Sequence, residues 1–266
     1  MMNKVAWVGL TLALLSLSAC QKDGDKELIQ AAAQDLAEAE DLFSQDDLDI
    51  DLAVEDRGGS GSCPTVTLAN PWGVWPNTIA IDYGADGCTR ADGRVVKGKV
   101  IVNQSAPLWT ANCTRSMTYD NYFVDDVQVE GSRAWINNGL NAEGQWNFTR
   151  NIQGMKLSYP DGTSVMWNRS NTLTLIAGGN TPNVFIDDVW SSVGEASGTN
   201  RKGESFSAQI VSPLIKRNNC RWISEGVLTL TRGGASGTLD YGAGVCDRFA
   251  TLTTAGGDTY TVRLRR

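Results

Sequence analysis

From Cys63 to the end of the chain, apolar and polar residues alternate in short runs, and this alternation constrains the fold most strongly. In residues 259–265 it places Tyr260, Val262 and Leu264 on one face and polar residues on the other, as in a half-buried strand. Residues 172–175 and 228–231 alternate in the same way. Turn sequences such as Pro160-Asp161-Gly162 and Gly256-Gly257-Asp258 separate such runs. Because no helical pattern separates these strands, we expect an all-β domain. The expected form is an antiparallel meander, folded as a sandwich or a partly open barrel.

The acidic residues are concentrated ahead of this region. The formal net charge is −7, yet residues 21–58 hold 13 acidic and 3 basic side chains, which leaves +2 for residues 59–266 once Lys4 is counted. Within the acidic segment, apolar residues recur at three- and four-residue steps and predict one amphipathic helix. These residues are Leu28, Ile29, Ala32, Leu36, Ala39, Leu42 and Phe43. The acidic pI of about 4.7 argues against a nucleic-acid partner, whose phosphates require clustered Lys and Arg.

The chain contains no histidine. This excludes Ser-His-Asp and Cys-His catalysis, His-ligated zinc, His-ligated haem and imidazole-based pH switching. Nucleotide-binding loops and the Gly-x-Ser-x-Gly elbow are also missing from the sequence, so we expect no cofactor and favour a binding protein over an enzyme.

The N-terminus has the pattern of a secretory signal. One positive charge in residues 1–4 precedes an apolar run, residues 5–17, that is too short to span a bilayer. The run ends in Leu17-Ser18-Ala19-Cys20, which resembles a bacterial lipobox. That resemblance implies cleavage after residue 19 and acyl chains, including palmitate, on Cys20 as a membrane anchor. The alternative is an ordinary signal peptide with a chance cysteine.

The predicted organisation is therefore a signal peptide over residues 1–19, a lipid-anchored acidic spacer with one short helix over 20–62, and an all-β domain over 63–266. Gln21-Lys22-Asp23-Gly24-Asp25 resembles the charged export signals of surface lipoproteins in the Bacteroidota. We expect an outer-membrane location with the domain facing the cell surface.

An internal repeat occurs at both ends of the β domain, in residues 63–90 and 220–248. Each copy has a Cys, about nineteen residues, Asp-Tyr-Gly-Ala, two residues, a second Cys, and an Arg two positions later. Each copy has room for a hairpin. This equivalence predicts the disulfides Cys63–Cys88 and Cys220–Cys246. Four buried thiols or an all-thiolate metal site are the alternatives, although the short Cys-x-x-Cys pairs of zinc sites are missing. Cys113 is left over and is expected to be a buried free thiol.

Two further segments match each other, Phe123-Val124-Asp125-Asp126-Val127 and Phe185-Ile186-Asp187-Asp188-Val189. The paired carboxylates fit tight hairpin turns, because Asp tolerates turn conformations; calcium binding is the alternative. Asp82, Asp125, Asp187 and Asp240 are also the candidates for a carboxylate-based glycoside hydrolase, which needs two acids across a cleft.

The loop between the inferred strands of the first repeat is Asn70-Pro71-Trp72-Gly73-Val74-Trp75-Pro76-Asn77. Prolines stiffen such a loop, and indoles offer flat apolar faces with an N–H donor. Trp72 and Trp75 are either a platform for a sugar or a protein, or a plug for the open end of the sheet. The other tryptophans are expected in the core or in cross-strand pairs; they are Trp109, Trp135, Trp146, Trp167, Trp190 and Trp222.

The chain resembles a family of uncharacterised envelope lipoproteins of Bacteroidota. The resemblance rests on the segments Glu38–Asp56, Ile79–Lys99, Val129–Gly131, Ser197–Gly203 and Asp240–Asp247. It implies an envelope lipoprotein of the same make, but no activity is attached to the family, so no catalytic residue carries over. We therefore expect a non-catalytic module that binds a glycan or an envelope protein. The alternatives are the hydrolase above, a carrier of lipids or apolar ligands, and a structural envelope protein.

Overall fold

The computed structural model describes residues 29–36, 50, 63–90, 93–181 and 185–264. One α-helix covers residues 29–36, and a short 3₁₀ helix, η1, covers Phe185–Asp187. The strands are β1 (Thr65–Leu68), β2 (Asn77–Asp82), β3 (Cys88–Thr89), β4 (Val95–Gln104), β5 (Thr114–Val124), β6 (Val127–Leu140), β7 (Trp146–Ser158), β8 (Ser164–Ala177), β9 (Val189–Thr199), β10 (Ser205–Arg217), β11 (Ile223–Arg232), β12 (Ala235–Ala243), β13 (Phe249–Thr254) and β14 (Thr259–Arg263).

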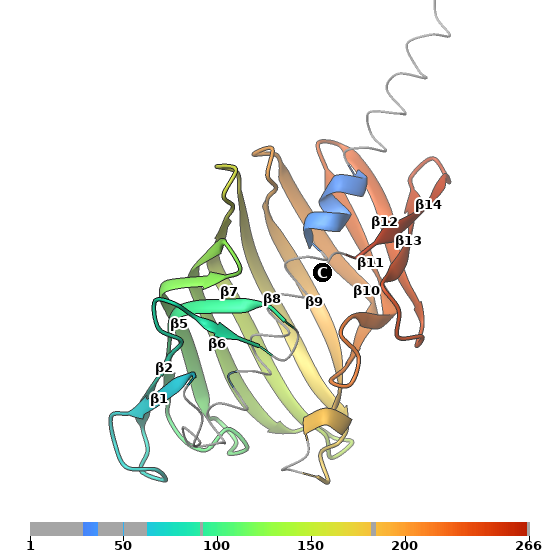
Figure 1. The fold of residues 1–266 in the computed structure, drawn as a ribbon. Helices are drawn as coiled ribbons and strands as arrows, with labels where there is room; N and C mark the ends of the chain where they lie inside the picture. The colour runs from blue at the N-terminus through green and yellow to red at the C-terminus, as the bar shows by residue number, and fades with distance from the viewer. Residues whose placement is uncertain (1–28, 37–49, 51–62, 91–92, 182–184, 265–266) are drawn as a thin grey trace, which may run out of the picture.

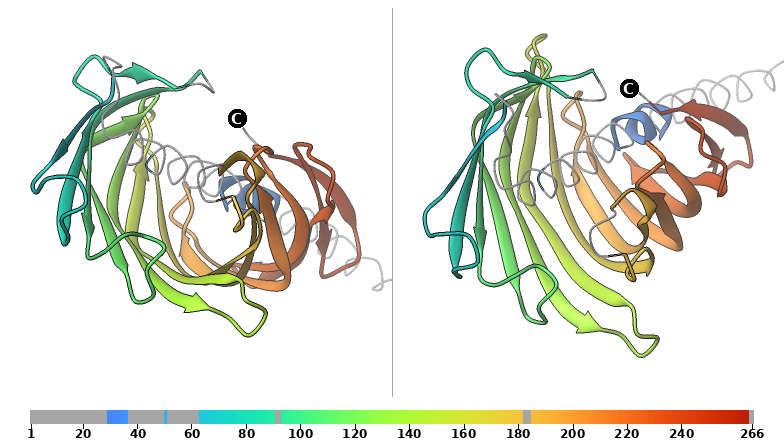
Figure 2. Two further views of the ribbon diagram at one scale, coloured as in Figure 1. Left: turned by 90° about the horizontal axis from the view of Figure 1, so that it is seen from below. Right: turned by 60° about the horizontal axis from the view of Figure 1, so that its bottom comes forward.

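These strands form one antiparallel meander. Apart from β3, which pairs with β4, each strand is hydrogen-bonded to the strands before and after it, from β1 to β14. The sheet bends into a trough whose two edges remain apart, so it does not close into a barrel (Figure 1; Figure 2). The expected all-β meander is confirmed, in its partly open form. It is a single curved sheet and not a sandwich, because long strands such as β6 to β8 bend continuously around one core.

The alternation seen in the sequence divides the sheet into two faces. In β8, for example, Val165, Trp167, Leu173 and Leu175 are buried on the inner face, whereas Met166, Asn168 and Ser170 are exposed on the outer face. The inner face carries the hydrophobic core, and the outer face is covered mainly by Ser, Thr, Asn and Gln.

The helix of residues 29–36 lies inside the trough against β10 to β12 (Figure 2). Ile29, Ala32 and Leu36 are buried in the core cluster, which confirms the apolar face predicted for this helix. A Cβ atom at Gly237 of β12 would lie 3.2 Å from Ile29 Cγ2, so the missing side chain there makes room for the helix. Ile50 is also fully buried in the core. These parts of the acidic segment are thus part of the folded body; the other residues of that segment, and Cys20, lie outside the described residues.

Both disulfides predicted from the repeat are present. Cys63 pairs with Cys88 and Cys220 with Cys246, each with a Cα–Cα distance of 5.7 Å. Each one links the segment before a hairpin, β1–β2 or β11–β12, to the segment after it. Cys113 is the free, buried cysteine that we expected. It precedes β5 in a turn, where its thiol donates to the Ala106 carbonyl at 3.1 Å.

The two Asp-Asp segments differ in structure despite their similar sequences. Asp125 and Asp126 form the tight β5–β6 turn, with Asp125 in a left-handed conformation (φ 52°). Asp187 ends η1, and Asp188 is buried just before β9. The hairpin interpretation is wrong for this second pair. The Asn218 amide donates to the Asp188 carbonyl at 2.9 Å and fixes the segment to the end of β10 instead.

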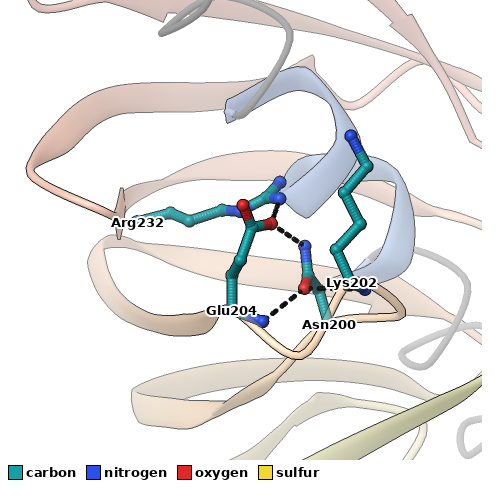
Figure 3. Close-up of polar contacts among 4 residues, drawn as sticks. All are labelled: Asn200, Lys202, Glu204 and Arg232. Carbon is teal, nitrogen blue, oxygen red and sulfur yellow. Dashed lines mark hydrogen bonds and ion pairs between the residues drawn. The ribbon is translucent and has the colours of Figure 1, made fainter.

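A buried ion pair joins the β9–β10 turn to β11. Glu204 pairs with Arg232, whose side chain is fully buried, and Asn200 holds the turn by accepting from the Lys202 and Glu204 amides at 3.0 and 2.9 Å (Figure 3). Burial lowers the pKa of the Arg232 guanidinium, and the Asp35 carboxylate of the helix acts in the opposite direction.

Candidate binding site

The Trp loop, residues 69–76, connects β1 to β2 at one edge of the sheet. Trp72 is 40% exposed and Val74 48%, and Trp75 is half-buried. The two indoles lie edge to face with their centroids 6.3 Å apart. Neither belongs to the core cluster or to the side chains that pack against it. The Trp loop therefore presents an aromatic pair at the surface, and this arrangement favours the platform over the plug.

Two asparagines hold the ends of the Trp loop together. The Asn70 amide donates to Asn77 Oδ1 at 3.1 Å, and Asn77 Nδ2 donates back to the Asn70 carbonyl at 2.9 Å. Asn70 Nδ2 also donates to the Pro76 carbonyl at 2.9 Å. Because Asn77 is buried and the loop contains two prolines, the indoles are carried on a preorganised support. The sequence contains this Asn pair, but only the fold shows that the Asn77 side chain binds the Asn70 backbone across the loop.

A hollow of about 540 Å³, here called the rim hollow, adjoins the Trp loop on the outer face of β2, β4, β5 and β6. Asn70 and Pro76 of the loop line it on one side. Its floor carries neutral polar side chains such as Thr78, Asn103 and Ser116. The hollow thus offers hydroxyl and amide groups beside the exposed aromatic pair.

A larger hollow of about 800 Å³, here called the central hollow, lies on the outer face of β7 to β11. Its lining is again composed largely of Ser, Thr, Asn and Gln, with Glu195 as its carboxylate. Nothing in the sequence taken strand by strand indicates this hollow, because its residues come from five strands.

One row of outer-face residues runs through both hollows; it is here called the polar row. Its members are paired directly across neighbouring strands, one from each strand between β2 and β14 except β3. They are Thr78, Asn103, Ser116, Ala134, Asn151, Ser170, Glu195, Gln209, Thr229, Thr238, Thr253 and Thr259.

The four carboxylates considered for glycoside hydrolysis each stabilise a local turn or contact. Asp82 and Asp240 accept from the Gly84 and Gly242 amides at 2.9 and 2.8 Å, so they have the same role in the two repeats. Asp125 accepts from the Val95 amide at 2.9 Å, and Asp187 accepts from Thr181 Oγ1 at 2.8 Å. Each of these contacts holds a neighbouring turn or strand backbone or side chain, as is typical of structural carboxylates.

Within the part of the chain that the structure describes, no three His, Cys, Asp or Glu side chains cluster as a metal site. The same portion contains no helix with the length and hydropathy needed to cross a membrane.

The inner face carries buried arginines beside its hydrophobic core. Four arginines of β5 to β8 project into it, Arg115, Arg133, Arg150 and Arg169, and all are buried. Burial lowers the pKa of Arg169 to about 10. Arg133, Arg150 and Arg169 each lie over the ring of an aromatic residue, and the helix of residues 29–36 packs inside the trough.

The remaining tryptophans contribute to the core, as expected. Trp135 and Trp167 are buried, and Trp109, Trp146, Trp190 and Trp222 pack against the core cluster. Trp109 belongs to a loop and stacks on Trp190, with the ring centroids 6.5 Å apart.

Comparison of the chain with models of protein families, with curated proteins and with solved structures gave no match.

Proposed function

We propose that this protein is a non-catalytic glycan-binding module, held at the outer membrane by a lipid on Cys20 and facing the cell surface. The observation that carries the proposal is the pair of the exposed Trp72 and the half-buried Trp75, kept out of the core at the border of the rim hollow.

The site offers partners for both the apolar C–H faces and the polar hydroxyl groups of a sugar. The apolar faces of indole rings pack on the C–H faces of a sugar ring and bury little polar surface. The hydroxyl and amide groups of Thr78, Asn103 and Ser116 donate and accept hydrogen bonds, as sugar hydroxyls require. The rim hollow carries one cation among its lining residues, Arg115, whose side chain is buried toward the inner face.

The test uses the full chain, purified from membranes in detergent and applied to a glycan array. We expect Trp72→Ala and Trp75→Ala each to weaken binding by about 2 kcal/mol or more, roughly thirtyfold, because central aromatic contacts dominate such sites. The free energy of unfolding of the Trp72→Ala variant should change by less than about 0.5 kcal/mol, as for other exposed positions. Phe249→Ala, at an aromatic residue that is 47% exposed on β13, is the matched control.

Three results would oppose the proposal. A large loss of stability in the Trp variants would indicate the plug, and binding of envelope proteins without any glycan would indicate a protein partner. The anchor is tested separately by metabolic labelling with palmitate: label that persists in Cys20→Ala would rule out lipidation at this residue.

A further inference from the structure

The polar row is unusual in its continuity. Cross-strand pairing carries it without interruption from Thr78 on β2 to Thr259 on β14. Of its twelve members, Glu195 is charged and Ala134 is apolar, so the remaining ten carry hydroxyl or amide groups. Exposed faces of soluble proteins usually contain about 25–35% Lys, Arg, Glu and Asp. Solubility alone would not require a row with so few charged residues, so its neutral polar side chains call for another explanation.

Both hollows of the outer face lie on the polar row. The rim hollow is lined by its first four members, from Thr78 to Ala134. The central hollow is lined by the next five, from Asn151 to Thr229. The Trp loop, the rim hollow and the central hollow therefore follow one line across the strands.

Side chains along this line are oriented by their neighbours. Thr78 Oγ1 donates to Asn103 Oδ1 at 2.8 Å, and Ser170 Oγ donates to Asn151 Oδ1 at 3.0 Å. These bonds use the amide oxygens and fix the direction of each amide. The NH₂ groups of Asn103 on β4 and Asn151 on β7 are directed away from these bonds and offer donors at two points along the row.

We propose that the polar row binds an extended, uncharged polysaccharide that runs across the strands, with one end of the bound segment on the Trp loop. This inference rests on the proposed glycan-binding function and specifies its ligand as a polymer. Neighbouring strands are about 4.8 Å apart, so the nine members in the hollows span roughly 38 Å along the sheet, enough for several sugar units.

The near absence of charge in the polar row favours a neutral polymer over an acidic one. The polar row has one carboxylate and no cation, and the arginines that line the two hollows, Arg115 and Arg169, are buried, so the row itself offers no exposed cation to an acidic polysaccharide or a nucleic acid. Its members also lack the aromatic and large aliphatic side chains that form the centre of a protein interface. Repeated hydroxyl and amide groups are complementary to a polymer with repeated hydroxyl groups.

The test measures retardation of the full chain in native gels that contain neutral polysaccharides (β-glucan, α-glucan, mannan or xylan) or acidic ones (alginate or polygalacturonate). Oligosaccharides of two to eight units from the retarding polymer then give affinity as a function of length. We expect retardation by a neutral polymer, and an affinity that rises at least tenfold from two units to eight.

The variant Gln209→Lys places a cation in the central hollow at an exposed position, far along the polar row from the Trp loop. It should remove the gain with length while leaving the affinity for two units unchanged, whereas Trp72→Ala should weaken both. Thr229→Lys repeats the test at a second member of the row. Thr261→Lys, exposed on β14 and outside the row and both hollows, is the matched control. Circular dichroism spectra of the variants are the check that each one is folded.

Each outcome decides one of the two proposals or both. If short sugars bind but affinity is independent of length, or if folded Gln209→Lys and Thr229→Lys bind long oligosaccharides normally, the polar row is not a binding surface and the proposed function stands. Preference for the acidic polymers would also overturn the inference. If no sugar of any length binds, the proposed function fails and the inference fails with it.

Discussion

Arg232 on β11 and Glu204 in the β9–β10 turn form an ion pair at the inner face of the sheet, although Arg232 is only 1% exposed (Figure 3). Asn200, itself buried, donates to the same Glu204 oxygen at 3.2 Å. A charge buried to this extent requires a compensating partner. The contact therefore ties three consecutive strands to one another at the end of the trough where the helix lies.

Glu204→Gln should lower the free energy of unfolding by about 1–2 kcal/mol, because it removes the anion facing a buried guanidinium. The loss is expected below the 3–5 kcal/mol of fully buried pairs, since Glu204 is 41% exposed and Asp35 also acts on Arg232. Urea unfolding followed by Trp fluorescence measures it. Glu143→Gln, in the exposed β6–β7 turn, should change little, and an equal loss there would contradict the assignment.

The helix of residues 29–36 is expected to stabilise the sheet, because its apolar residues belong to the core. Ile29→Ala and Leu36→Ala should each cost about 2–4 kcal/mol, as for large-to-small substitutions in a core. Gln34→Ala, on the less buried side of the same helix, is the control in urea titrations. Losses below about 0.5 kcal/mol for both core variants would mean that the helix is only loosely attached.

The two disulfides should contribute equally. They close loops with sequence separations of 25 and 26, so the chain-entropy model gives about 3–4 kcal/mol for each. We expect the paired alanine variants Cys63→Ala/Cys88→Ala and Cys220→Ala/Cys246→Ala to lose similar amounts of unfolding free energy. Cys113→Ala, at the unbridged cysteine, should lose less. A clearly unequal result would show that loop closure is not the main contribution.

Asp82 should make stability depend on pH. The hydrogen bond from Lys99, at 2.9 Å, and that from the Gly84 amide lower the pKa of the Asp82 carboxyl. A carboxyl whose pKa is lower in the folded state stabilises the protein above its unfolded pKa of about 3.9, and this contribution is lost as the pH falls through the folded pKa.

Asp82→Asn should therefore reduce the melting temperature slightly at pH 7 and leave it unchanged near pH 2. The effect at pH 7 should stay below about 1 kcal/mol, because solvent screens this exposed pair. Thermal melts at the two pH values measure it. A loss of the same size at both would assign the effect to the turn geometry and not to the charge.

Part of this protein follows directly from local sequence. Alternation alone predicts the strands, since successive side chains of a strand point to opposite faces whatever the strand contacts. The two equivalent Cys units predict both disulfides, and the three- and four-residue spacing predicts the buried face of the helix. The exposed Trp pair could be proposed from sequence, because two indoles between two prolines have few structural uses in a loop.

Other features depend on contacts between residues far apart in the chain. Asp125-Asp126 and Asp187-Asp188 have nearly the same sequence context, yet only the first pair is a hairpin turn, because Asn218 binds the backbone beside the second. The sequence also could not predict which residues face one another across the strands in the polar row. Irregularities between Ile210 and Ser212, and between Gln209 and Leu214, shift the register of neighbouring strands.

Sequence therefore determined which residues form strands and which cysteines pair, because those properties depend on local periodicity and on an internal repeat. Tertiary structure decided that one sheet curves around the helix of residues 29–36, and which side chains line up across it. The physical reason is that cross-strand register and sheet curvature are set by the simultaneous burial of the whole inner face, which no single segment encodes.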